Sequence, residues 1–250
     1  MDKKLYIVGI GPGKPEGMTI EAKRILEESD VLAGYPVYLE LLPQELRSRR
    51  DGTPKQEIRS GMTKEIERCR LALSAAAEGH KVSLVCSGDP GVYGMAGLAL
   101  SLKQEFPEVE IRVIPGVTAA LSGAALLGAP LIHDFAVISL SDRLTPWEKI
   151  EARLKHAAEA DFVIVLYNPE SKGRSGYLAR ACSLLLTVLE PERPAALVHK
   201  IGREGEAVWT GTLEEMQDQP ADMFTTVFIG NSNTALLDGS MITDRGYREK

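Results

Sequence analysis

The 250-residue chain contains few of the residues that form covalent or metal cross-links. It has three cysteines, none of them in a Cys-x-x-Cys pair, and four histidines that lack the spacing of metal ligands. The cysteines are Cys69, Cys86 and Cys182, and the histidines are His80, His133, His156 and His199. An odd number of distant cysteines argues against a disulfide framework and against a zinc site. We therefore expect no protein-bound metal and a reducing, cytoplasmic environment.

Long apolar runs and a basic charge balance are also absent. No segment reaches the roughly 20 apolar residues of a bilayer-spanning helix. The apolar run that begins at Leu5 is short and interrupted by glycine, unlike a secretory signal peptide. The net charge of −6 argues against a general nucleic-acid binder. These absences predict a soluble cytoplasmic protein without membrane or nucleic-acid partners, and they leave room for a local basic pocket that binds an anionic small molecule.

The sequence does contain a regular alternation of Val- and Ile-rich runs with helical patterns. Strands are predicted over 5–11, 31–35, 81–88, 110–116, 162–168, 195–202 and 225–231. Helices are predicted over 19–30, 63–80, 94–106, 118–129, 145–161 and 176–189. Apolar strands that are each followed by a helix predict an α/β fold with a mostly parallel sheet covered on both faces.

The later part of the chain has short turns between strands, which predicts a mixed, more antiparallel sheet. We therefore expect two α/β domains, an N-terminal one over residues 1–130 and a C-terminal one over residues 131–250. No Ser/Gly-rich linker separates them.

Three glycine-bearing turns follow predicted strands of the N-terminal domain. They read GIGPG from Gly9, SGDPGVYG from Ser87 and IPGVTAA from Ile114. Because the strands are expected to be parallel, all three turns should lie at the carboxyl edge of the sheet, where α/β proteins bind their ligands. The shared location predicts a cofactor site there more strongly than any single turn does.

The first turn does not match the known nucleotide-binding loops. Gly9 and Gly11 fit the dinucleotide fingerprint, but Lys14 occupies the third glycine position and Pro12 has no N–H to donate. The acidic ribose ligand is missing, because Asp30 precedes the second strand, and no Gly-Lys-Ser/Thr sequence forms a Walker loop. Taken alone, this stretch is equally consistent with a tight turn and with direct cofactor contact.

Asp89 also has two interpretations. Between Gly88 and Pro90 at a strand end, its carboxylate could accept hydrogen bonds from a ribose or an amino group of a ligand. It could instead form an Asx-type turn with its own backbone.

Read in order, VGIGPG followed by Thr19, then SGDPGVYG, then IPGVTA, resemble the tetrapyrrole (corrin/porphyrin) methylase family. The resemblance continues over essentially the whole chain. The stretches LLGAPLIHDFAVISLSDRLTPWEKIEARL, ADFVIVLYNPESKGR and GSMITDRGY are similar to the branch that methylates C17 of a precorrin-3-type macrocycle and contracts its ring in cobalamin biosynthesis. The resemblance implies two α/β domains that bind S-adenosyl-L-methionine between them, release S-adenosyl-L-homocysteine and form a homodimer.

The resemblance also implies which residues bind the cofactor. In the N-terminal domain they are Pro12, Gly88, Asp89, Val92, Thr118 and Ala119. In the C-terminal half they are Tyr167, Asn168, Lys200, Thr225 and Thr226, which would enclose the adenine.

Ring contraction should require a proton acceptor or donor near the macrocycle. The stretch IHDFAVISLSD offers a polar cluster for this role, with His133, Ser139 and Asp142 as the catalytic candidates and Asp134 and Ser141 beside them. Asp142 could equally be a turn or helix-cap residue ahead of Pro146.

A corrinoid precursor carries many carboxylates, so basic side chains should line its site. Lys172 and Arg174 are the candidates for substrate binding, with Lys200 and Arg203 on a later loop. Each of these could equally be a solvent-exposed charge without function. Three alternative functions stay open: methylation of another ring position or target, a nucleotide-dependent oxidoreductase, and a non-enzymatic binding module. The broken dinucleotide fingerprint and the three cofactor loops disfavour the last two.

Overall fold

A computed structural model of the chain describes residues 3–171 and 173–247. The chain divides into two compact units, Met1–Thr118 and Ala119–Lys250, so the boundary expected at residue 131 lies inside the second unit. The reason is helix α6 (Ala119–Leu127), whose residues Ala120 and Leu127 are buried in a core cluster with Phe228 of the second sheet. The helix that would have ended the first domain therefore belongs to the core of the second.

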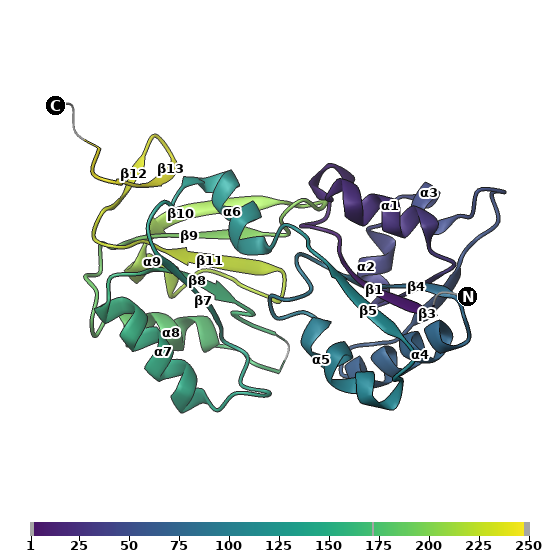
Figure 1. Cartoon of the computed structure of the whole chain (residues 1–250). Helices are drawn as coiled ribbons and strands as arrows, with labels where there is room; N and C mark the ends of the chain where they lie inside the picture. Colours follow the sequence, from purple (N-terminus) through teal and green to yellow (C-terminus); the bar gives the residue numbers. More distant parts are fainter. Residues whose placement is uncertain (1–2, 172, 248–250) are drawn as a thin grey trace. The chain divides into compact units, whose positions relative to one another are not determined.

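The first unit is built on a five-stranded sheet in the order β3-β2-β4-β1-β5 (Figure 1). All of its paired strands are parallel, which confirms the predicted parallel sheet. The strands are β1 (Lys4–Gly9), β2 (Val31–Gly34), β3 (Gln56–Arg59), β4 (Lys81–Cys86) and β5 (Glu110–Ile114). The helices are α1 (Ile20–Glu28), α2 (Pro36–Glu40), α3 (Gln44–Arg47), α4 (Glu65–Ala77) and α5 (Ala96–Ser101), with 3-10 turns η1 (Pro15–Gly17) and η2 (Leu102–Glu105).

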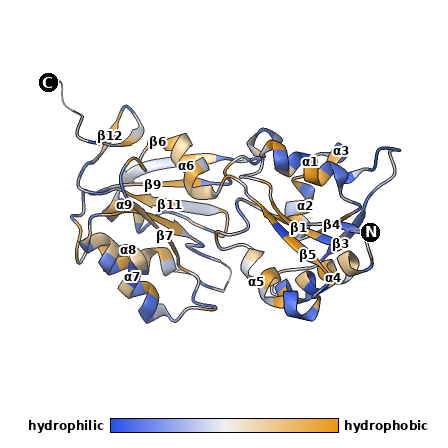
Figure 2. Cartoon of the chain, in the orientation of Figure 1, coloured by the Kyte–Doolittle hydropathy of each residue, from blue (hydrophilic) through white to orange (hydrophobic). Residues whose placement is uncertain are grey.

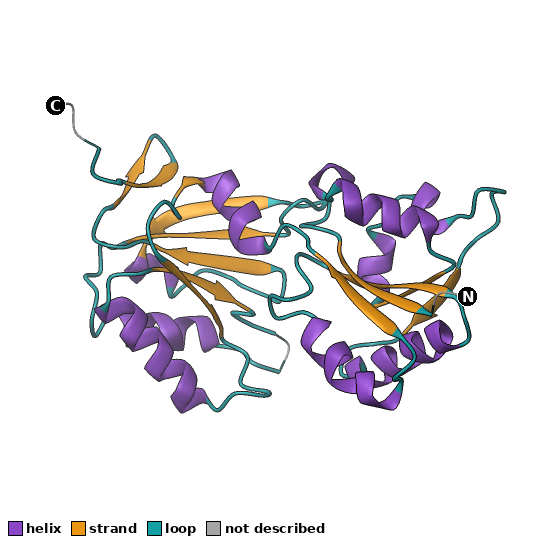
Figure 3. Cartoon of the chain, in the orientation of Figure 1, coloured by secondary structure: helices purple, strands orange, loops and turns teal. Residues whose placement is uncertain are grey.

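Helices cover both faces of this sheet because successive side chains of a strand point to opposite sides (Figure 3). Leu5 and Ile7 of β1 pack into the cluster that contains α4 and α5. Tyr6 and Val8 pack into the other cluster, with α1, α2 and α3. The near-continuous apolar sequence of β1 thus follows from burial on both faces.

The second unit contains a five-stranded sheet in the order β10-β9-β11-β8-β7. Only β7 and β8 pair in parallel, and the other pairs are antiparallel, which confirms the predicted mixed sheet. The strands are β7 (Phe135–Ser139), β8 (Val163–Tyr167), β9 (Pro194–His199), β10 (Ala207–Thr212) and β11 (Thr225–Ile229). A small separate sheet, β12-β13-β6, contains β6 (Gly128–Ala129), β12 (Thr234–Leu237) and β13 (Ser240–Thr243).

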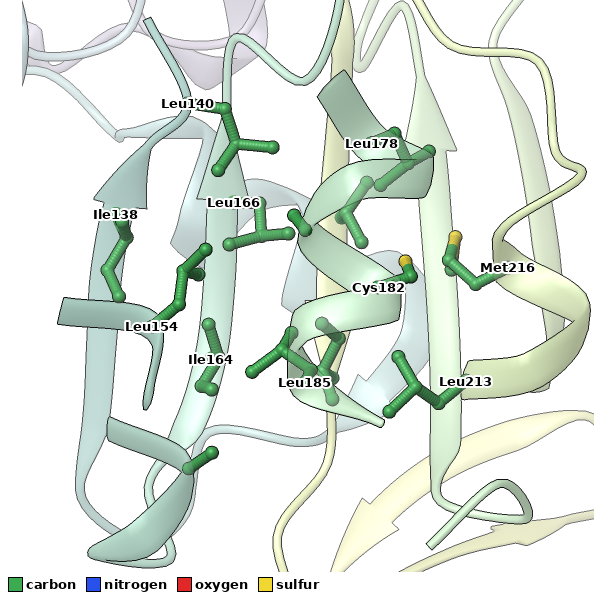
Figure 4. Close-up of a cluster of buried hydrophobic side chains, with 14 of the residues drawn as sticks. Ile138, Leu140, Leu154, Ile164, Leu166, Leu178, Cys182, Leu185, Leu213 and Met216 are labelled. Atoms are coloured by element: carbon green, nitrogen blue, oxygen red, sulfur yellow. The ribbon is translucent and has the colours of Figure 1, made fainter. Parts of the chain in front are cut away.

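One face of the mixed sheet is covered by α7 (Trp147–Glu159), α8 (Tyr177–Leu185) and α9 (Leu213–Met216). Figure 4 shows Leu154 of α7 beside Ile164 and Leu166 of β8, and Met216 of α9 beside Cys182 of α8, within the same apolar cluster. Helix α7 shows why these segments are helical: its buried residues recur with a helical period, and its other positions are hydrophilic apart from Ala152 (Figure 2).

The predicted elements differ from the observed ones mainly at their ends. The helix expected over 94–106 is α5 followed by the 3-10 turn η2, and the helix expected over 118–129 ends at Leu127. The short elements β3, α2 and α3 were not expected, because four or five residues carry too little periodicity to be recognised. No described helix is long and apolar enough to span a membrane. The described residues also contain no group of three or more His, Cys, Asp or Glu side chains that could hold a metal ion.

All three cysteines are buried and unpaired, and burial raises the pKa of their thiols, to about 11 for Cys69 and about 12 for Cys86 and Cys182. Since the thiolate is the reacting form, we expect no cysteine of the folded protein to react with iodoacetamide at pH 8 within an hour. All three should react in denaturant. Mass spectrometry after labelling checks this, and rapid labelling of any cysteine in the folded protein would contradict the burial.

Candidate active site

The first and second glycine turns are joined by backbone hydrogen bonds beyond the ends of β1 and β4. The amide of Gly11 donates to the carbonyl of Gly88 at 3.2 Å, and the amide of Gly88 donates to the carbonyl of Gly11 at 2.7 Å. Gly11 and Gly88 both have left-handed backbone, with φ of 69° and 66°, which glycine adopts readily. The two turns are therefore hydrogen-bonded to each other at the carboxyl edge of the sheet.

The third turn packs against the first two through the backbone of its glycine, Gly116. A Cβ atom added to Gly116 would lie 2.2 Å from the carbonyl oxygen of Gly88 and 2.8 Å from the carbonyl carbon of Gly9. A Cβ atom added to Gly9 would lie 2.7 Å from the amide nitrogen of Gly116. Because the obstructing atoms are backbone, the three turns can meet only if these positions are glycine.

Asp89 ties the second turn to the third. Its Oδ1 accepts a hydrogen bond from the amide of Gly91 at 2.7 Å, and its Oδ2 accepts one from the amide of Gly116 at 3.0 Å. The first contact is the Asx-type turn that the sequence left open. Each oxygen keeps a further lone pair, and the side chain is only half-buried, so Asp89 can still accept a hydrogen bond from a ligand.

The segment between the first turn and α1 confirms that this is not a dinucleotide loop. The 3-10 turn η1 intervenes, and α1 begins only at Ile20. Thr19 is its N-cap, as predicted, and accepts a hydrogen bond from the amide of Ala22 at 3.1 Å. The Thr19 hydroxyl also donates to the carbonyl of Pro115 at 3.4 Å, which links this segment to the third turn.

The remaining cofactor candidates up to Ala119 lie in the three turns or within a few residues of them. Pro12 is half-buried and its ring packs near Gly17, where an added Cβ would lie 3.0 Å from the proline Cδ. The amide of Val92 donates to the carbonyl of Asp89 at 3.3 Å. Thr118 ends the first unit and Ala119 begins the second, and both are half-buried.

In the second unit, the cofactor candidates lie at one edge of the mixed sheet. Tyr167 ends β8, Lys200 follows β9, and Thr225 begins β11, which runs antiparallel to both. The Tyr167 hydroxyl accepts a hydrogen bond from the amide of Ala120 at 2.6 Å. Thr225 and Thr226 are buried, and the Thr225 hydroxyl donates to Asp222 Oδ1 at 3.1 Å. Register thus brings together residues that are far apart in the sequence.

The ends of the parallel strands β7 and β8 carry a second group of polar residues at this same edge. Asn168, which has left-handed backbone with φ of 53°, donates from Nδ2 to Ser139 Oγ at 3.0 Å. The amide of Ser141 donates to the same oxygen at 3.2 Å. Two loops, 140–146 and 168–176, are therefore fastened to each other where they leave the sheet.

Asp142 lies in a turn, one of the two roles left open by the sequence, and does not cap a helix, since α7 begins at Trp147 after Pro146. Its Oδ2 accepts a hydrogen bond from the hydroxyl of Tyr177 at 2.7 Å. That hydrogen bond raises the pKa of Tyr177 above that of a free phenol. Sequence reasoning did not single out Tyr177; its only signal is its position at the start of the helix that follows the 168–176 loop.

The substrate candidates lie on that loop. Arg174 Nε donates to Ser171 Oγ at 3.2 Å, whereas its Nη1 is buried without a hydrogen-bond partner in the described structure. A buried guanidinium N–H without a partner is energetically costly and suits an anionic ligand. Lys172 lies outside the described residues.

His133 is not part of this group. It precedes β7, and its Nε2 lies 3.0 Å from the carbonyl oxygen of Asp244, whereas Ser139 is the last residue of the strand. Asp134 also precedes the strand. Five strand residues span about 17 Å, so the proposed catalytic cluster is divided between the two ends of β7.

Comparison with known proteins identifies the class to which this fold and these loops belong. The sequence profile of the Tetrapyrrole (Corrin/Porphyrin) Methylases matches residues 4–217. The chain belongs to this family.

Individual relatives are similar over nearly the whole chain. The probable cobalt-factor III C(17)-methyltransferase of Salmonella typhimurium is 49% identical over 97% of this chain and 99% of its own length. The crystal structure of the methyltransferase CobJ is 36% identical, with a TM-score of 0.87 over 96% of this chain and 99% of that chain. Some curated relatives are longer, and this chain spans 46% of one of them.

A more distant solved structure shares the fold. Uroporphyrin-III C-methyl transferase from Thermus thermophilus, solved in complex with S-adenosyl homocysteine, has a TM-score of 0.71 and 24% identity over 91% of this chain and 97% of that chain.

Proposed function

We propose that this protein transfers a methyl group from S-adenosyl-L-methionine to C17 of a cobalt-factor III or precorrin-3-type tetrapyrrole, with contraction of the ring, in cobalamin biosynthesis. The observation that carries the proposal is the close similarity, over almost the full length, to a C17-methyltransferase. We further propose that the enzyme works in the cytoplasm as a homodimer, as the family resemblance implies.

In the first unit, we assign cofactor binding to the three turns. Gly88, Asp89 and Val92 would contact the methionine or ribose portion, and Pro12 would pack against the cofactor. The residues fit this role, because Asp89 retains free lone pairs and the neighbouring glycines let a ligand approach the backbone. When bound, S-adenosyl-L-methionine supplies an electrophilic methyl group on a sulfonium.

Further cofactor contacts follow along the chain. Thr118 and Ala119 are small residues that would leave room for the cofactor. In the second unit we assign adenine contacts to Tyr167, Asn168, Lys200, Thr225 and Thr226, which share one edge of the mixed sheet.

The chain's own contribution to the reaction is orientation and proton transfer. Methyl transfer to carbon needs a correctly placed nucleophile more than it needs a strong acid, so positioning is the main demand on the protein. Arg174, with its unpartnered Nη1, would bind a substrate carboxylate. Of the catalytic candidates, we retain Asp142 and Ser139, which lie at the ligand-binding edge of β7. His133 lies at the far end of that strand.

Incubation with S-adenosyl-L-methionine and either a cobalt-containing factor III or a metal-free precorrin-3-type macrocycle tests the proposal. We expect one of the two to gain the mass of one methyl group and to release one S-adenosyl-L-homocysteine per product. The two arms also distinguish a cobalt-bearing substrate from a metal-free one. No methylation in either arm, together with tight binding of NAD, would favour the oxidoreductase alternative instead.

A further inference from the structure

We propose that Tyr177 is a positioning residue for this reaction, and that its hydroxyl holds the ionised Asp142 carboxylate as acceptor of the proton that the macrocycle loses on methylation. The inference rests on the proposed function and extends it to a residue that the sequence did not suggest.

Tyr177 and Asp142 form a close hydrogen-bonded pair. The Tyr177 hydroxyl donates to Asp142 Oδ2 at 2.7 Å, which is a short, charge-assisted hydrogen bond. No donor lies within hydrogen-bond distance of Oδ1 in the described structure, and Asp142 is only half-buried. One carboxylate oxygen is therefore fixed, and the other has lone pairs available for a proton.

Tyr177 is itself held by an aromatic neighbour. Its ring packs edge-on against Trp147 of α7, with ring centroids 4.8 Å apart and an interplanar angle of 68°. Trp147 is buried, and the guanidinium of Arg180 lies 4.3 Å from its ring centroid. Aromatic pairs of this geometry restrict both rings, so the hydroxyl points to Asp142 without further ordering.

The pair lies beyond the carboxyl ends of β7 and β8. Asp142 lies on the loop after β7, and Tyr177 follows the loop after β8. The hydrogen bonds from Asn168 and Ser141 to Ser139 join these two loops at the carboxyl edge of the parallel pair, where α/β sheets bind ligands. Arg174, a substrate-binding candidate with a buried and unpartnered Nη1, lies on the loop that precedes Tyr177.

The charges around the pair are compatible with an ionised Asp142. Arg174 and Arg180 both act electrostatically on Tyr177, and Arg143 is adjacent to Asp142 in the chain. Glu151 of α7 is paired with Arg180 at 2.9 Å, so its negative charge is largely balanced. Glu170 lies on the same loop as Arg174, and its Oε1 accepts a hydrogen bond from the amide of Gly176 at 2.9 Å. Both signs of charge are therefore present near the pair.

The proton balance of the reaction requires an acceptor. The nucleophilic carbon of the macrocycle forms the new C–C bond with its π-electron pair, and the electron pair of the broken C–S bond stays on sulfur. A neutral macrocycle then carries one positive charge, which it loses when an N–H or C–H proton moves to Asp142 Oδ1. Asp142 becomes a neutral carboxylic acid, and Tyr177 keeps its proton throughout.

A double-mutant cycle tests the inference, with methyl transfer measured as kcat and KM for the tetrapyrrole. Asp142→Asn should lower kcat by about 100-fold or more, the usual loss when a general base is removed. Tyr177→Phe should lower kcat about tenfold, as for the loss of one hydrogen bond to a charged group, and leave KM nearly unchanged. Because Tyr177 acts through Asp142, adding Tyr177→Phe to the Asp142→Asn variant should lower kcat little further.

Two controls separate this role from a structural one. Tyr247→Phe removes a hydroxyl from a side chain that is 85% exposed and should leave kcat and thermal unfolding unchanged. In the ligand-free protein, ultraviolet titration of the tyrosines should show the pKa of Tyr177 falling towards its ordinary value in Asp142→Asn, because the hydrogen bond that raises it is lost.

The outcomes are distinct. If the wild-type protein methylates no tetrapyrrole, the proposed function itself fails. If the wild type is active and Tyr177→Phe equals it in kcat, the inference alone is overturned. Fully additive losses in the double mutant, or a tyrosine titration that Asp142→Asn leaves unchanged, would also overturn it.

Discussion

Gly116→Ala should abolish measurable binding of S-adenosyl-L-homocysteine and lower the free energy of unfolding by about 3 kcal/mol, the upper range for overpacking a tight site. The added methyl group would lie 2.2 Å from the Gly88 carbonyl oxygen and 2.8 Å from the Gly9 carbonyl carbon. Both obstructing atoms are backbone, so the third turn must move away from the first two. Isothermal calorimetry measures the affinity, and urea denaturation measures the stability.

The first unit offers matched controls for this substitution. Gly61 and Gly97 have nothing within 4 Å of an added Cβ. Gly61→Ala should change neither affinity nor stability, and Gly97→Ala, inside α5, should stabilise the protein by about 0.5–1 kcal/mol. If Gly116→Ala bound S-adenosyl-L-homocysteine as the wild type does, the three turns would not form the cofactor site.

Asp89→Ala should have the second large effect, with affinity for S-adenosyl-L-homocysteine reduced more than tenfold and the free energy of unfolding lowered by about 2–3 kcal/mol. The carboxylate accepts hydrogen bonds from two backbone amides, at Gly91 and at Gly116, and alanine leaves both amides without this acceptor. Asp89→Asn should also lose affinity, because an amide offers one acceptor oxygen and turns its NH₂ group towards the second backbone N–H.

Asp51→Ala is the control for this pair of variants. Asp51 also accepts hydrogen bonds from Thr53, at 2.9 Å from the amide and 2.6 Å from the hydroxyl, but on an exposed loop and within that loop alone. Asp51→Ala should lower the free energy of unfolding by less than about 1 kcal/mol and leave the affinity for S-adenosyl-L-homocysteine unchanged. Wild-type affinity in Asp89→Ala would show that Asp89 neither binds the cofactor nor shapes its site.

Much of the fold could be predicted because the sequence contains short Val- and Ile-rich runs that alternate with helical periods. The run from Leu5 to Ile10 predicts a buried strand, and it is one, since both of its faces are covered. The short elements β3, α2 and α3 could not be found, because tertiary packing rather than local pattern defines them. The position of α6 in the second unit is likewise set by its packing partner Phe228, which lies about a hundred residues later in the chain.

The candidate site could be predicted only in part. The three turns were recognisable from their glycines, but the sequence could not show that Asp89 links two of them or that Gly9 and Gly116 touch the same backbone. The Asp142–Tyr177 hydrogen bond joins residues on different loops and has no local signature. The sequence also grouped residues that the fold separates. His133 and Asp142 are close in sequence but lie at opposite ends of β7.

The measurement that tests the central proposal most directly is the position of the transferred methyl group. The protein is incubated with the tetrapyrrole and S-adenosyl-L-methionine labelled with ¹³C in its methyl group, and the product is examined by NMR. We predict a single labelled methyl group, attached to C17 of a contracted ring. A label on another ring carbon would contradict the C17 assignment, and an unlabelled macrocycle would contradict methyl transfer altogether.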